Sequence, residues 1–205
     1  MRVGTEGDLD GEEIDLLNRF VGGSLAAAVA AAVCAFGAAA SNPGKPFHSS
    51  MFQPPFTVRL PTGWIVAERN PLGVQFYKSC RSCPDGGEEH GEVTLDSSLS
   101  NLSVARAIKL LHRTTSGAEA GPVHQVAIGS LQGMAFTARR IGRPVQVPQI
   151  GYSTDPTGQP LLVLVVKRVG KTLTILVDSG PVPKAQAAIF TANADALLKT
   201  LKFST

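Results

Sequence analysis

An uncharged segment of 21 residues, Phe20 to Ala40, constrains this chain more than any other feature. Its length matches the roughly 20 residues that a helix needs to cross the hydrocarbon core of a membrane. Ten of its residues are alanine, and small side chains favour insertion much less than Leu, Ile, Phe or Val do. We therefore expect one N-terminal hydrophobic helix of marginal membrane affinity, followed by a separate folded region.

Three interpretations of this segment remain open. The small residues Ala38 to Ala40 before Ser41 resemble the cleavage site of an export signal, although the leader is acidic where a basic one is usual. An uncleaved transmembrane anchor is the second interpretation, and Arg19 weakly favours an outside C-terminus. Lipid attachment at Cys34 is the third, and bulky Val33 before it argues against it. All three place residues 41–205 outside the cytoplasm; only a buried helix would not.

Charge and composition divide the chain into four segments. Residues 1–19 carry six acids and two bases, for a net charge of −4, and the remainder carries +7. Phe47, Met51 and Phe52 could dock on the folded domain from a stretch rich in Pro, Gly and Ser. The expected segments are an acidic N-terminal segment (1–19), a transmembrane anchor or signal peptide (20–40), a tether (41–55) and a globular domain (56–205).

Period-2 alternation of apolar residues predicts strands in the globular domain. Phe56, Val58 and Leu60 alternate with polar residues, and two further strands follow across tight turns, which suggests a meander. The run from Leu161 to Val166 is apolar on both faces, so we expect a strand that is covered on both sides. The other expected strands are 64–67, 74–77, 92–95, 124–128, 131–140 and 172–177, with a long loop or irregular hairpin over 139–160.

Helical spacing appears twice in this domain. Apolar residues from Val104 to Leu111 follow a helical period, and either Asn101 or Ser103 can cap the start of this helix. A second apolar stripe runs from Ala187 to Leu201. Antiparallel strands around two helices predict an α+β fold, with helices flanking the sheet.

Several motifs in this order resemble the Mog1/PsbP-like α/β/α sandwich superfamily. The domain opens with Phe-x-Val-x-Leu-Pro-x-Gly-Trp from Phe56 to Trp64 and continues with Gly-Val-Gln-Phe at Gly73. The helix that begins at Leu102 is similar to the middle helix of the family, and Val126 to Gly133 looks like its central strand and turn. The closing helix and final apolar pair resemble Phe190 to Phe203.

The resemblance implies a fold and a broad role. Members of the superfamily are largely non-enzymatic, and they include photosystem II extrinsic subunits and exported bacterial proteins. It therefore implies a binding or assembly-accessory domain, and the N-terminal segment adds that this domain is exported or membrane-tethered. We expect its partner to be another membrane or envelope protein, or an anionic lipid surface. The resemblance carries no functional residue over, because its motifs are turn and core positions.

The pair Cys80 and Cys83 is the sharpest local feature that could carry chemistry. In an oxidising compartment the two thiols would form a disulfide. With His90, and Glu88 or Glu89, they could instead hold a zinc ion. A redox-active pair and free thiols without a role are further alternatives. A metal- or thiol-dependent envelope protein that uses Cys80, Cys83 and His90 is thus the alternative function.

No other pattern points to catalysis. The sequence has no nucleophile elbow, metalloprotease helix, phosphate-binding loop or dinucleotide fingerprint. We therefore expect a protein that is not an enzyme and has no cofactor.

Basic residues near strand ends are either ordinary solvated positions or a surface that attracts anionic lipid or an acidic partner. They are Arg139, Arg140, Arg143, Lys167, Arg168 and Lys171. Nucleic acid is not expected as a partner, because aromatic residues are only 6% of the chain and occupy expected core positions.

Overall fold

The computed structural model describes residues 44–79, 88–168 and 170–204. The predicted helix over residues 20–40 lies outside these ranges, as do the acidic segment 1–19 and the cysteines Cys80 and Cys83. These expectations therefore stay predictions. The described part is an α+β fold, mostly antiparallel sheet with two helices, as the sequence indicates.

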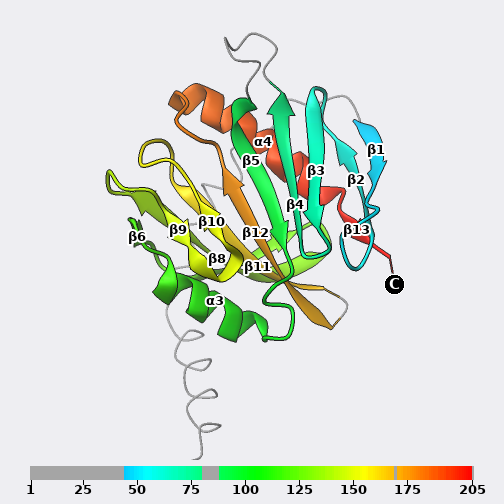
Figure 1. Ribbon diagram of the computed structural model, residues 1–205, viewed down its shortest axis with the longest axis horizontal. Coiled ribbons are helices and arrows are strands. Elements are labelled where there is room, and N and C mark those ends of the chain that lie inside the picture. The colour runs from blue at the N-terminus through cyan, green and yellow to red at the C-terminus, as the bar shows by residue number, and fades with distance from the viewer. Residues whose placement is uncertain (1–43, 80–87, 169, 205) are drawn as a thin grey trace, which may run out of the picture. The chain divides into compact units, whose positions relative to one another are not determined.

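An antiparallel sheet of eight strands organises the described fold (Figure 1). In spatial order its strands are β3 (Trp64–Asn70), β4 (Gly73–Ser79), β5 (Glu88–Asp96), β12 (Lys171–Asp178), β11 (Leu161–Arg168), β8 (Leu131–Arg140) and β6 (Ala118–Ala120), with β7 (His124–Ile128) also paired to β8. The hairpin of β11 and β12 lies in the middle, with Leu164 opposite Ile175. It is buried on both faces, as the apolar run of β11 predicts.

One face of this sheet is covered by helix α4 (Lys184–Lys199) and by a small second sheet. We call it the α4 face, and the opposite one the α3 face. That sheet contains β1 (Lys45–His48), β2 (Phe56–Leu60) and β13 (Lys202–Phe203), all antiparallel. Ala194, Leu197 and Leu198 of α4 pack into one apolar core with Phe56 of β2 and Phe76 of β4. Full burial of each large apolar side chain contributes about 1.5–3 kcal/mol, so this face supplies the larger core.

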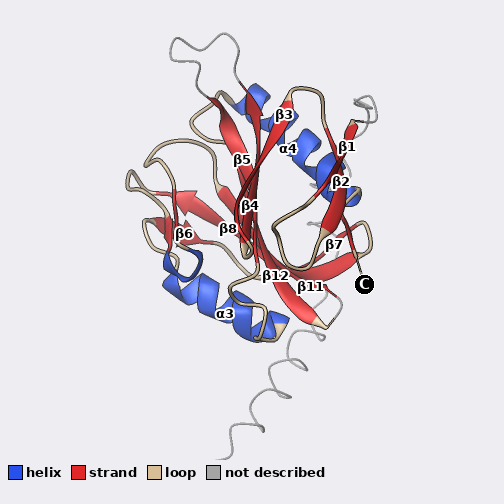
Figure 2. Ribbon diagram, turned by 45° about the vertical axis from the view of Figure 1, so that its right-hand side comes forward, coloured by secondary structure: helices blue, strands red, loops and turns tan. Residues whose placement is uncertain are grey.

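The α3 face carries helix α3 (Val104–Thr114), which Ser103 caps at its N-terminus. Its buried residues Ala107, Ile108 and Leu111 share a second core with side chains of β8 and β11. An arm formed by β9 (Gln146–Val147), the 3-10 turn η1 (Pro148–Ile150) and β10 (Tyr152–Ser153) packs into the same core. The two helices thus lie on opposite sides of the strands (Figure 2).

The structure differs from the sequence-based expectations in two places. The expected meander of three strands is wrong, because β2 pairs with β1 and β13 rather than with β3. Residues 44–55 do not hang free as a tether would, since β1 lies in this stretch and Phe52 is completely buried. Phe47 also packs against the core, whereas Met51 stays exposed. Alternation of apolar and polar residues does not by itself specify which strand pairs with which. Residues 44–55 lie against the domain because Phe47 and Phe52 pack on its core.

Candidate functional site

The α3 face is apolar over β8 and β11 but polar over β4 and β5. Strand alternation sends Val93 and Leu95 into the core on the α4 face, so the residues between them face the other side. Cross-strand pairing sets Gln75 opposite Thr94 and Gly73 opposite Asp96. The residues that β4 and β5 present on the α3 face are Gly73, Gln75, Tyr77, Glu92, Thr94 and Asp96. Because α3 packs on β8 and β11, this polar half of the face is left to the arm.

Two adjoining hollows form a trough between these strands and the arm. One has a volume of about 380 Å³ and is lined by Gln75, Thr94 and Asp96; the other has about 460 Å³ and reaches Asp155 and Asp178. They share Glu92, Tyr152 and Ser153, so they form one continuous depression along β5. We call this depression the polar trough, its first half the Gln75 end and its second half the Asp178 end.

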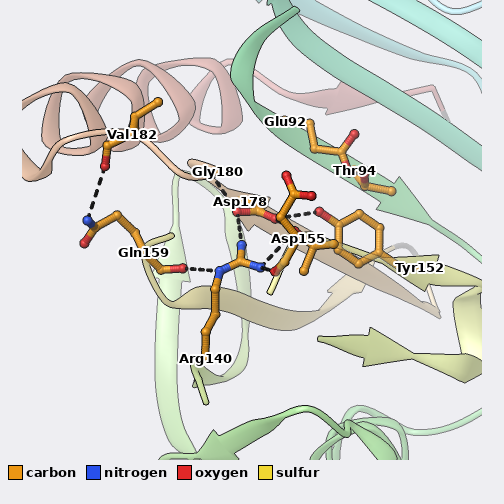
Figure 3. A network of polar contacts seen from close by, with 10 residues as sticks. Glu92, Thr94, Arg140, Tyr152, Asp155, Gln159, Asp178, Gly180 and Val182 are labelled. Carbon is orange, nitrogen blue, oxygen red and sulfur yellow. Dashed lines mark hydrogen bonds and ion pairs between the residues drawn. The ribbon is translucent and has the colours of Figure 1, made fainter. Parts of the chain in front are cut away.

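A buried ion pair closes the Asp178 end (Figure 3). Arg140 Nη2 lies 2.6 Å from Asp178 Oδ1, and their side chains are 4% and 5% exposed. Arg140 also donates to the carbonyls of Gln159 and Asp155 and to the hydroxyl of Thr154. These bonds tie β8 and β12 to the loop that follows β10, so the pair fixes the wall of the trough.

The carboxylate of Asp178 accepts four hydrogen bonds. Besides Arg140 its donors are the hydroxyls of Tyr152 and Thr154 and the backbone N–H of Gly180. Burial by itself would raise the pKa of Asp178, but these hydrogen bonds and the charge of Arg140 hold it below its ordinary value. Burial raises the pKa of Tyr152, and the charges of Asp178 and Glu92 raise it further. Asp178 is therefore ionised and Tyr152 protonated across the physiological pH range.

At the Gln75 end, the polar side chain of Gln75 has no described hydrogen-bond partner, in contrast to the fully bonded Asp178. Gln75 is only 9% exposed and lines the trough. Its carboxamide makes no hydrogen bond to any of the described residues. Its amide atoms are not among the described side-chain atoms that are fully buried without a partner, so they reach the open space of the trough. This end of the trough therefore offers a donor and an acceptor that no described residue uses.

A second polar group beside Gln75 is Asp96, which is 7% exposed. Its Oδ1 accepts a hydrogen bond of 2.8 Å from the backbone N–H of Ser98. Burial raises the pKa of Asp96, and the hydrogen bonds from Ser98 only partly oppose that effect. The charged form of Asp96 is therefore less well compensated than that of Asp178.

The side chains that the sequence suggests as a metal or thiol site lie outside the part of the chain that the structure describes. Cys80 and Cys83 lie outside the described residues, and so do the side chains of Glu88, Glu89 and His90, although these three positions belong to β5. In the ranges that the structure does describe, no three His, Cys, Asp or Glu side chains are grouped to hold a metal ion. The disulfide and the alternative zinc site stay predictions.

The basic residues of the sequence do not form one patch. Arg139 pairs with Glu119, Arg140 is buried in the trough wall, and Arg168 is 5% exposed. The guanidinium of Arg168 lies 4.2 Å from the ring centre of Phe203, and burial lowers its pKa to about 10. Arg139 is nevertheless exposed, and so are Arg143, Lys167 and Lys171.

Sequence reasoning missed the polar trough. Its residues come from β4, β5 and β10, and only the strand register sets them side by side. One signal was available: Val74 to Tyr77 and Glu92 to Asp96 both alternate apolar with polar residues. That pattern indicated a polar strand face, but not that two such faces adjoin beneath the arm.

Neither helix in the described ranges is long and apolar enough to cross a membrane. No protein-family model matches the sequence. No curated protein matches it either.

Several solved structures are similar to this chain at low sequence identity. A protein from Bacteroides thetaiotaomicron has 16% identity and a TM-score of 0.46 over 80% of this chain, which spans only 50% of that protein. LpqN, involved in cell envelope biogenesis of Mycobacterium tuberculosis, has 9% identity and a TM-score of 0.43, covering 81% of this chain and 88% of its own. PsbP from the cyanobacterium Synechocystis sp. PCC 6803 has 12% identity and a TM-score of 0.42, covering 82% and 97%.

Proposed function

We propose that the globular domain is a non-catalytic binding domain and that the polar trough is its ligand site. The observation that carries this proposal is the side chain of Gln75, which is 9% exposed, lines the trough and has no partner among the described residues. Its carboxamide opens into the trough, so it can donate to and accept from a ligand without breaking a bond of the fold. The rigid, hydrogen-bonded wall at Asp178 favours binding too, because a preformed site loses little entropy when a ligand enters.

The protonation states in the trough support binding rather than proton transfer. A general acid or base works best when its pKa lies near the operating pH. The pKa of Asp178 is lowered and that of Tyr152 is raised, so both groups are held away from neutrality. They offer a ligand fixed hydrogen-bonding groups rather than an exchangeable proton.

We further propose that the domain works outside the cytoplasm, on a component of the membrane or cell envelope. The support for this location is the uncharged segment 20–40, which suits an export signal or an anchor. The charge of +7 after residue 19 would also attract an anionic lipid surface at short range.

Photocrosslinking in the native host tests the proposed site. A benzophenone amino acid replaces Ser153, an exposed residue shared by both halves of the trough, in the full chain. The matched control carries it at Ile189, which is 64% exposed on α4. We expect an adduct at position 153 that disappears when Gln75→Met is added, and no such adduct at position 189. Equal adducts at both positions, or one that survives Gln75→Met, would contradict the proposal.

The alternative that uses Cys80, Cys83 and His90 has its own test. Under our proposal, replacing both cysteines by serine in the same crosslinking strain should leave the adduct at position 153 intact, because the described lining of the trough supplies the ligand contacts. Loss of the adduct in that variant, with the protein still folded, would favour the metal- or thiol-dependent function instead.

A further inference from the structure

The Gln75 end contains a space beside Gly73 that no side chain of the strand occupies. Gly73 stands opposite Asp96 in the strand pair, so no side chain fills that position of the strand. A Cβ placed on Gly73 would lie 3.7 Å from Asn70 Oδ1 and 4.0 Å from Asp96 Oδ2. The space above Gly73 is therefore bounded by an amide and a carboxylate, with the carboxamide of Gln75 two residues along the same strand face.

The groups around this hollow are suited to a donor with several N–H bonds. Asn70 Oδ1 and Asp96 Oδ2 border the hollow, and Gln75 lines it with a carboxamide, so each of the three brings an oxygen that can accept a hydrogen bond. Asn70 Oδ1 already accepts from the backbone N–H of Leu72 and has a second lone pair. An ammonium group carries three donors and no acceptor, so a set of acceptor oxygens suits it. Thr94 lies opposite Gln75 and adds a hydroxyl group; the residue is 8% exposed.

The charge at this site favours a cation as well. Asp96 and Glu92 line the Gln75 end, and Asp155 lines the Asp178 end. No lysine or arginine among the described residues lines either half. This acidic lining lies on a part of the chain with a net charge of +7, so its sign is a local property rather than that of the whole domain.

We propose that the hollow above Gly73 binds a primary ammonium group, held by Asp96, Gln75 and Asn70. This inference rests on the proposed function, because it names the ligand chemistry of the same trough. Two sources offer such a group: a lysine side chain of a partner polypeptide, or a free polyamine. Charge-assisted hydrogen bonds to Asp96 would supply most of the affinity, and Gln75 would complete the ring of acceptors.

Calorimetric titration of the full chain at low salt tests the inference with three probes: acetyl-tetralysine amide, spermidine and the neutral sugar maltotetraose. We expect saturable binding of at least one amine and none of the sugar. Binding of the peptide alone identifies a lysine side chain as the source, and binding of spermidine alone identifies a polyamine; both support the inference. Binding of the sugar alone, or of no probe, overturns it.

Four variants locate the binding. Asp96→Asn and Gln75→Met should each weaken amine binding by about tenfold, the equivalent of one lost hydrogen bond to a charged group. Gly73→Ala should weaken it too, and its Cβ contacts of 3.7 Å or more allow the fold to stay unchanged. Asp195→Asn, on α4 at the opposite face of the sheet, is the matched control and should change the affinity less than twofold. Equal effects of Asp96→Asn and Asp195→Asn would overturn the inference, since they indicate diffuse attraction of a cation.

The two proposals fail in different ways. If the adduct at position 153 still depends on Gln75 but no amine binds, the trough remains a ligand site and only the ammonium assignment is wrong. If that adduct is absent as well, the proposed function fails with it.

Discussion

The two ends of the polar trough differ in how far their polar side chains are hydrogen-bonded within the fold. At the Asp178 end every oxygen of the carboxylate is bonded, and Arg140 supplies the matching charge. At the Gln75 end the carboxamide of a residue that is 9% exposed opens into the trough and has no partner among the described residues. Both ends lie on one sheet face, so burial alone does not explain the difference. The comparison suggests that the first end holds the fold together and that the second is kept for a ligand.

The largest expected effect comes from breaking the closed end. Asp178→Asn leaves the guanidinium of Arg140 buried at 4% exposure without its counter-ion. Removing one partner of a buried pair typically costs about 3–5 kcal/mol. We expect a loss of that size in the free energy of unfolding, measured by urea denaturation. The exposed Asp155→Asn is the control and should stay within about 0.5 kcal/mol of the wild type.

The pH dependence of stability should have opposite signs at the two ends. The pKa of Asp178 is lowered in the fold, so its contribution is present above the ordinary carboxyl pKa of about 3.9 and is lost as the pH falls below it. The pKa of Asp96 is raised, so its contribution is present below about 3.9 and is lost as the pH rises through the raised value. Urea midpoints from pH 2.5 to 7 check this.

The variants separate the two contributions to that pH profile. Asp178→Asn should flatten the acid side of the stability profile, and Asp96→Asn should remove the loss that occurs as the pH rises. Profiles of the same shape in both variants would contradict the difference between the two ends.

Tyr152→Phe should have an intermediate effect. It removes the hydroxyl that donates to Asp178 Oδ2 over 3.0 Å and keeps the ring packed among the residues of the α3 core. A buried hydrogen bond to a charged group contributes about 1.5–3 kcal/mol, and the three other donors to Asp178 remain. We expect a destabilisation near the lower limit of that range by urea denaturation. A stability equal to the wild type would show that Tyr152 does not brace the trough wall.

Gln75→Met should have the smallest effect on stability. The variant keeps the length of the side chain and replaces an amide without a described partner by an apolar group. We expect the unfolding free energy to stay within about 0.5 kcal/mol of the wild type or to rise. A loss of more than about 1 kcal/mol would mean that the amide stabilises the fold, and would remove the contrast between the two ends.

Most of the fold could be predicted from the sequence because local periodicity determines its elements. The helix of Val104–Thr114 and the hairpin of β11 and β12 follow from apolar spacing and from the Gly170–Lys171 turn. The placement of β2 could not be predicted, because Phe56 and Val58 would be equally buried in either sheet. Partner choice depends on contacts between distant segments, and a single pattern does not contain them.

The trough could not be predicted from the sequence either, because it also depends on contacts between distant segments. Gln75 and Thr94 are 19 positions apart and become neighbours only through the register of β4 and β5. The buried pair of Arg140 and Asp178 was not foreseen either, and Arg140 was grouped with exposed basic residues that it does not join. The pair Cys80 and Cys83, by contrast, is visible in the sequence because its residues are neighbours in the chain.

The most direct test of the binding site is the side-chain amide signal of Gln75 in the nitrogen NMR spectrum, assigned by its absence in Gln75→Met. Gln159 is the internal reference, because its amide already donates to the carbonyl of Val182. The spectrum is recorded before and after native envelope extract is added. We predict that the Gln75 signal shifts while that of Gln159 stays in place. An unchanged Gln75 signal, or equal shifts of both amides, would contradict the account.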